Sequence, residues 1–206
     1  MSGTGLKERH AESAALRRVV RWVAVLNLAY FFVELSVAQR IGSVALFADS
    51  IDFLEDASVN LLILMALGWS AQRRGAVGLL LAGILLVPGL ATVWTAWQKF
   101  LLPVAPAPVP MSLTGLGALA VNFACAWMLA RVRHVGGSLS RAAFLSARND
   151  VLANVAIMAA GGVTLLWVSA WPDLLVGAGI FLMNLDAARE VYEAARRERQ
   201  TPAASP

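Results

Sequence analysis

The segment Phe47–Asn60 reads FADSIDFLEDASVN and holds four carboxylates in close succession, at Asp49, Asp52, Glu55 and Asp56. The stretches on either side, SVAL and LLILMAL, are apolar enough to lie in lipid. At about 100° per residue, the three aspartates and Asn60 fall on one stripe of a helix, and Glu55 projects to its side. An ionised acid at the bilayer centre costs at least about 2.5 kcal/mol, so such acids face a bundle interior and mark an ion or proton path. The segment therefore predicts a membrane helix with a polar site on one face.

The composition of the whole chain supports a membrane protein. Of its 206 residues, 59% are hydrophobic and only 15% are charged, well outside the norm for soluble domains. Apolar runs of roughly the 20 residues that span a bilayer lie at 19–38, 43–68, 76–98, 111–130, 142–169 and 174–195. We therefore predict an all-α bundle of six transmembrane helices at 19–195, with short cytoplasmic tails at 1–18 and 196–206.

The basic residues predict the orientation of this bundle. Nearly all Lys and Arg side chains fall on one side of the predicted layout, and only Arg40 and Lys99 fall on the other. By the positive-inside rule both termini are cytoplasmic. The net charge of +4 follows from this topology and gives no reason to expect nucleic acid as a partner. The small residues Ser36-Val37-Ala38 fit a signal-peptide cleavage site, but the apolar run is too long and contains Glu34, so we expect the first helix to be retained.

Motifs of soluble enzymes are missing from the sequence. It has no G-x-x-x-x-G-K-[ST] loop, no C-x-x-C pair and no H-E-x-x-H, and its single cysteine, Cys125, lies in an apolar run. No nucleophile and base can be paired, so we expect no enzyme and no bound cofactor.

A second polar stripe follows in the fifth predicted helix, where Ser146-Ala-Arg-Asn-Asp-Val-Leu-Ala-Asn154 places Ser146, Asp150 and Asn154 on one face. The pattern repeats Asp52-x-x-x-Asp56-x-x-x-Asn60 with one ligand replaced. Each stripe occupies the middle helix of a three-helix half, as in inverted-repeat transporters with a substrate site near the midplane. At 1.5 Å per residue, Asp52 lies about 15 Å from the outer end of its helix, close to that midplane.

Other interpretations of these polar residues stay open. A less favoured interpretation is that the acids are protonated or hydrogen-bonded and hold neighbouring helices together. Arg148 would repel a metal beside Asp150, so we expect it to pair with Asp49 or Glu55 or to extend toward the cytoplasm. A further stripe of the first helix, Asn27, Tyr30 and Glu34, fits a supporting network, a proton path or interhelical hydrogen bonding equally well. Asp186, Glu190 and Glu193 form a stripe that we interpret as a solvated helix end.

The stretch from Glu34 through Gly42-Ser-Val-Ala-Leu-Phe-Ala-Asp-Ser-Ile-Asp-Phe-Leu-Glu-Asp56 resembles the second-helix signature of the cation diffusion facilitator family of divalent-metal/proton antiporters. Asp52 and Asp56 match the His/Asp and Asp pair of that signature, Asp49 matches an earlier Asp, and Asp150 matches the second ligand of helix five. The stretch from Pro172 to Ala194 resembles the family's sixth helix.

The sequence departs from the family pattern at three places. Ser146 stands where the family usually has His or Asp, and the loop near Arg73 and Arg74 lacks the usual His-bearing segment. The chain ends at Pro206, so the resemblance identifies a short form without the family's cytoplasmic ferredoxin-like domain.

The resemblance implies a metal efflux transporter of the bacterial inner membrane that exchanges its metal for protons, surrounded by lipid and paired as a homodimer. The predicted metal-binding set is Asp52, Asp56, Asp150, Ser146, Asp49, Asn154 and Asn60. Zn, Mn and Fe(II) are the candidate transported ions, since an oxygen-rich shell suits Mn or Fe(II) and Zn also accepts carboxylates. The alternative is a membrane metal sensor or scaffold of the same fold that does not transport.

Overall fold

The computed structural model describes residues 3–66, 76, 90–132 and 137–183, with side chains described from residue 14 onward except at 66, 137–143, 145 and 146. Every regular element in these ranges is a helix. The long helices are α1 (Gly3–Ile41), α2 (Val44–Ala66), α4 (Pro108–Val132) and α5 (Gly137–Leu166). Two shorter helical stretches cover residues 90–101 and Trp171–Met183.

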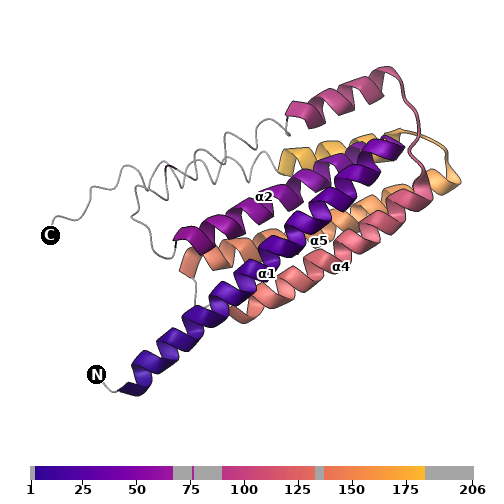
Figure 1. Ribbon diagram of the computed structural model, residues 1–206. Helices are drawn as coiled ribbons and strands as arrows, with labels where there is room; N and C mark the ends of the chain where they lie inside the picture. The colour runs from indigo at the N-terminus through magenta and orange to yellow at the C-terminus, as the bar shows by residue number, and fades with distance from the viewer. Residues whose placement is uncertain (1–2, 67–75, 77–89, 133–136, 184–206) are drawn as a thin grey trace.

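The four long helices form a bundle in which α1 packs against α2 and α4, and α5 packs against α4 and α2. Figure 1 shows the three described turns, at residues 42–43, 102–107 and 167–170, at one end of this bundle, which we call the turn end. Arg17, Arg18 and Arg21 near the start of α1 and Arg131 near the end of α4 lie toward the opposite end, which we call the arginine end. Helices α2 and α5 therefore run antiparallel, as an inverted repeat requires.

The turn between α1 and α2 takes only two residues. Gly42 has φ of 65°, the left-handed conformation that terminates helices, and the Ser43 nitrogen donates to the Ala38 oxygen at 3.0 Å. The Ser43 hydroxyl in turn accepts from the Leu46 nitrogen at 3.1 Å and caps the start of α2. This tight reversal fixes the register of the carboxylates on α2 against α1.

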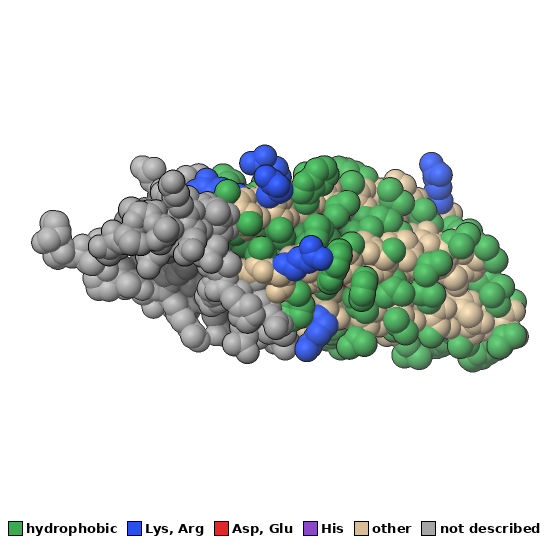
Figure 2. Space-filling view, turned by 90° about the horizontal axis from the view of Figure 1, so that it is seen from below, with side chains coloured by type: hydrophobic (Ala, Val, Ile, Leu, Met, Phe, Trp, Pro, Cys, Tyr) green, Lys and Arg blue, Asp and Glu red, His purple; other side chains and the backbone are tan. Residues whose placement is uncertain are grey.

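The surface of the described part is largely apolar. In Figure 2, hydrophobic side chains cover the visible face, and Lys and Arg side chains gather mostly next to the grey part of the chain. Within the described residues, three helices are long and apolar enough to cross a membrane, at Ala14–Ile41, Pro108–Val132 and Ala147–Leu166. Helix α2, with 23 residues, is long enough as well at about 34 Å, but it carries four carboxylates.

The interior of the bundle is divided into layers. One apolar cluster lies at the arginine end and includes Val20, Ile63 and Leu129, and another lies toward the turn end and includes Met111 and Ile157. Between them is a buried polar layer formed by Asn27, Glu34, Asp49, Asp56, Asn60, Asn122, Asp150 and Asn154. A polar layer between two apolar ones places the acids far from both bundle ends.

Several boundaries differ from the predicted ones. Helix α1 begins at Gly3 rather than near residue 19, because the charged segment before the apolar run continues the same helix. Helix α4 begins at Pro108, a residue that is tolerated in a first turn, where its missing N–H has no partner to lose. Trp171 and Pro172, predicted as a break, open the last described helix. Predictions for residues 67–75, 77–89, 133–136 and 184–206 lie outside the described residues, including the stripe from Asp186 to Glu193.

Candidate metal-transport site

Three carboxylates lie near one another where α2 and α5 face each other. Asp56 and Asp150 are each 9% exposed, and their carboxyl groups lie within hydrogen-bonding range of each other. Asp52, one turn away on α2, is half-buried, and Asp150 is its strongest electrostatic neighbour. We call Asp52, Asp56 and Asp150 the carboxylate seam. Its members come from the two stripes that the sequence predicted to form one site.

A second set of polar side chains lies next to the seam, toward the turn end, and crosses all four long helices. The Asn122 amide of α4 donates to the Asn154 side-chain oxygen of α5 at 3.0 Å. The Asn154 amide donates to Asp49 Oδ2 of α2 at 2.6 Å. Asp49 in turn lies beside Glu34 of α1, and the two carboxyl groups interact electrostatically. The Asn154 amide thus holds Asp49 directly, and the Asn122 amide acts on it only through Asn154.

Some acceptors in this region have no donor from the described residues. They are both Glu34 carboxyl oxygens, Asp49 Oδ1 and the side-chain oxygen of Asn60, and the Asn27 amide nitrogen is likewise without an acceptor. Nothing in the described part of the chain donates a hydrogen bond to these carboxyl oxygens. A buried carboxylate left without compensation is strongly destabilising, so the arrangement calls for protons or a cation.

The remaining predicted ligands have different positions. Asn60 is buried, and its amide donates to the Asp56 backbone oxygen at 2.8 Å, one turn back on the same helix. Asn154 and Asp49 bond to each other and so support the site through their mutual contact. Ser146 belongs to α5, but its side chain lies outside the described part of the structure. Among the described side chains, no three of the His, Cys, Asp and Glu type are gathered tightly enough to enclose a metal ion.

The supporting residues of α1 and α4 were only partly predictable. Asn27 and Glu34 are fully buried, and the Tyr30 hydroxyl donates to the Thr114 backbone oxygen at 2.7 Å, so the predicted stripe of α1 does face the interior. Asn122 did not enter the predicted site, although a lone Asn within an apolar run is a usable signal. Arg148 is exposed on the bundle surface, whereas Asp49 is buried among amides and Glu34.

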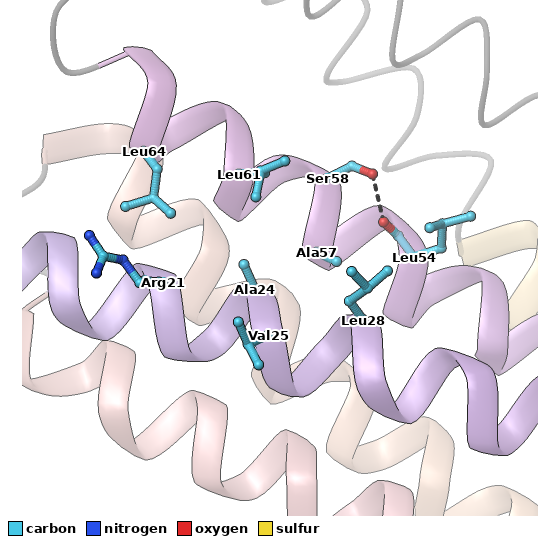
Figure 3. Close-up of a pocket in the computed structure, with 9 residues that line it drawn as sticks. All are labelled: Arg21, Ala24, Val25, Leu28, Leu54, Ala57, Ser58, Leu61 and Leu64. Atoms are coloured by element: carbon cyan, nitrogen blue, oxygen red, sulfur yellow. Dashed lines mark hydrogen bonds between the residues drawn. The ribbon is translucent and has the colours of Figure 1, made fainter.

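The groove between α1 and α2 is a separate feature. Figure 3 shows it lined by Leu28 and Leu54 toward one end and by Arg21 and Leu64 toward the other, with a cavity volume of about 150 Å³. The Ser58 hydroxyl within it donates to the Leu54 backbone oxygen at 2.8 Å, so this hydroxyl is satisfied within its own helix. None of the residues lining the groove is an acid, and the groove does not contribute to the carboxylate seam.

Comparisons with known proteins find zinc transporters that are similar to this chain. Zinc transporter ZitB of Yersinia pseudotuberculosis serotype I (strain IP32953) is 29% identical over 157 residues, which cover 69% of this chain and 50% of the relative. Zinc transporter ZitB of Yersinia pestis matches with the same identity and coverage. The chain thus spans about half the length of these curated relatives.

A family model matches most of the chain. The model of the cation efflux transmembrane domain matches residues 20–197, which include every residue of the polar layer. The match confirms the resemblance carried by the acidic segment of α2 and by the last helix. This chain is an integral membrane protein that belongs to the cation efflux family.

Proposed function

We propose that the chain carries a divalent metal cation out of the cytoplasm in exchange for protons, with the carboxylate seam as the ion site. The observation that carries this proposal is the approach of Asp52, Asp56 and Asp150 from two antiparallel helices inside the polar layer. Like charges this close repel one another unless protons or a cation lie between them. A site that accepts either of the two is what a metal/proton exchanger requires.

The exchange follows from the competition between metal and protons for the same oxygens. A carboxylate must lose its proton before it binds a metal, so loading the ion releases protons from the seam. Protonation from the opposite side neutralises the carboxylates and expels the ion. A proton gradient therefore drives export without nucleotide hydrolysis, consistent with the absence of a phosphate-binding loop from the sequence.

Each polar group has a distinct part in this proposal. Asp52, Asp56 and Asp150 contact the ion directly, with Asn60 and Ser146 in position along the same stripes to add oxygen ligands. Asn154 and Asn122 orient Asp49, which lies about 10 Å along α2 from Asp56. The arginine end faces the cytoplasm by the positive-inside rule, in the bacterial inner membrane.

Zinc is the first ion to test, because the two relatives are named zinc transporters and zinc accepts carboxylate oxygen. Mn and Fe(II) come next, since the described donors of the seam are all oxygen. No resident cofactor is proposed, and pairing into a homodimer remains a prediction.

Flux into proteoliposomes under an imposed pH gradient tests the proposal. We expect proton-coupled uptake of at least one of Zn, Mn and Fe(II), and loss of that uptake in Asp56→Asn and Asp150→Asn. The matched control is Glu55→Gln, which neutralises an acid next to Asp56 that lies off the stripe. Folded protein that moves none of these ions would overturn the transport proposal and favour a sensor or scaffold. Equal loss in the Glu55 control would overturn the assignment of the site.

A further inference from the structure

The turn end contains a buried ion pair that lies apart from the carboxylate seam. Lys99 Nζ, from the helical stretch 90–101, lies 2.8 Å from Asp173 Oδ2 at the start of the last described helix. Asp173 is fully buried and Lys99 is 7% exposed. Lys99 also donates to the Gly42 backbone oxygen in the turn between α1 and α2. We call Lys99, Asp173 and residues 42–45 the latch.

The latch joins three helices through hydrogen bonds to both carboxylate oxygens of Asp173. Besides Lys99, Asp173 accepts from the Ser43 hydroxyl at 2.6 Å, the Val44 nitrogen at 2.8 Å and the Ala45 nitrogen at 3.1 Å. The carboxylate of one helix therefore caps the N-terminus of another, where the helix dipole favours negative charge. The start of α2 is thus held by Asp173, which belongs to another helix.

The helices also come close together around the latch. Gly177 lies one turn after Asp173, and a Cβ there would come within 2.8 Å of Val44 Cγ1 and 2.9 Å of the Ala45 nitrogen. Val44, Ala170 and Leu174 form a small apolar cluster beside the ion pair, with Ala96 packed against it. The latch thus closes this corner of the bundle with both backbone contact and apolar packing.

The position of the latch relates it to the ion site. Asp52 lies eight residues after Val44, so the seam begins about 12 Å along α2 from the latch. The latch lies at the turn end, which the proposed orientation places away from the cytoplasm. The latch therefore lies on the side of the seam toward which the proposed export releases the ion.

An ion pair suits a contact that must open and close. Apolar residues of similar volume often stabilise a protein interior as well as a buried pair does. When a pair separates into water, however, each ion regains its hydration, which an apolar contact cannot do. We propose that the latch is the outer gate of the transporter, closed in this structure and opened when the ion is released. This proposal rests on the proposed transport function.

Cysteine labelling tests the gate without relying on transport as its readout. The native Cys125 is buried, so a Cys125→Ala background with Ser43→Cys places one thiol inside the latch. A membrane-impermeant maleimide added to proteoliposomes should not react with it at rest. During zinc uptake driven by a pH gradient the rate should rise at least about tenfold, because a minor open state of up to about 10% becomes a major one.

Matched variants control this experiment. Native Cys125 should stay protected in both conditions, and Ala107→Cys in the exposed turn before α4 should label in both. Lys99→Met in the Ser43→Cys chain leaves Asp173 unpaired, and should label at rest without zinc. Lys99→Met/Asp173→Asn removes both charges and should restore protection.

The possible outcomes separate the gate from the function on which it rests. Vesicles that transport zinc while the thiol introduced by Ser43→Cys stays protected would show a static contact, which overturns the gate and leaves the transporter. A Cys125→Ala parent that moves none of Zn, Mn and Fe(II) overturns both. If Lys99→Met does not fold, the comparison of resting and transporting Ser43→Cys protein still decides the proposal.

Discussion

Two buried acids of this molecule, Asp173 in the latch and Asp49 beside the carboxylate seam, have opposite surroundings. Asp173 accepts from a lysine, a hydroxyl and two backbone amides. Asp49 accepts from one asparagine amide and faces another acid, and its Oδ1 has no donor from the described residues. Both are fully buried. The protein saturates the acid of the closed latch, whereas an acid of the proposed ion path keeps acceptor capacity for what passes through.

The largest expected effect is a loss of stability when the buried carboxylate of Asp173 is removed. Removing one partner of a buried ion pair typically costs about 3–5 kcal/mol, because the remaining charge is left uncompensated. Asp173→Ala should therefore lower the unfolding midpoint strongly in detergent, measured by tryptophan fluorescence. The double variant Lys99→Met/Asp173→Asn should lose much less than Asp173→Ala. Equal losses in the two variants would contradict the assignment of the cost to the unpaired charge.

Replacing an acid of the carboxylate seam should not lower stability in this way. Asp56→Ala removes a proposed ligand and one of several mutually repelling acids, so stability should be unchanged or higher while zinc affinity falls. We expect a loss of at least about a hundredfold, since losing even a supporting partner of a ligand typically costs about 10–100-fold. Isothermal titration calorimetry measures the affinity, with Glu55→Gln as control. A variant that binds zinc normally but unfolds early would place Asp56 among the structural acids instead.

The acidic stripe of α2 and its partner stripe on α5 were predictable because helical periodicity places Asp52, Asp56 and Asp150 without knowledge of packing. Among the described residues, the four long helices were predictable from apolar run length, apart from the extension of α1 to Gly3, which continues through charged residues. The latch was not predictable. Lys99 was interpreted only as a charge on the outer side, and its partner lies 74 residues away, a pairing that depends on how three helices meet.

Asn122 shows the same limit inside the bundle. Its residue type marks a polar position in an apolar helix, but its partner Asn154 is fixed only by the packing of α4 against α5. Periodicity predicts which face of a helix is polar, whereas the direction of each amide depends on the neighbouring helix.

The pH dependence of zinc binding should come from the carboxylate seam alone. Zinc affinity should fall as pH falls, because the carboxylates bind zinc only when deprotonated and each displaced proton lowers affinity by up to about tenfold per pH unit. Calorimetry in buffers of different ionisation enthalpy counts the protons released. Asp150→Asn should reduce that count, whereas Lys99→Met/Asp173→Asn should leave it unchanged. A count of zero in the wild-type chain would rule out direct competition between metal and protons.

The smallest expected effect is on zinc affinity, when the asparagines that form the hydrogen-bond chain to Asp49 are replaced. Asn122→Leu removes a donor that reaches Asp49 only through Asn154, and a neutral hydrogen bond contributes about 0.5–1.5 kcal/mol, so zinc affinity should fall by no more than about tenfold. Asn154→Leu, which removes the direct donor to Asp49, should cost more, because hydrogen bonds to charged groups contribute about 1.5–3 kcal/mol. Calorimetric affinities of both variants and of the double variant form a mutant cycle. If Asn122 acts only through Asn154, adding Asn122→Leu to Asn154→Leu should change nothing, and additive losses would show that Asn122 reaches the site by another route.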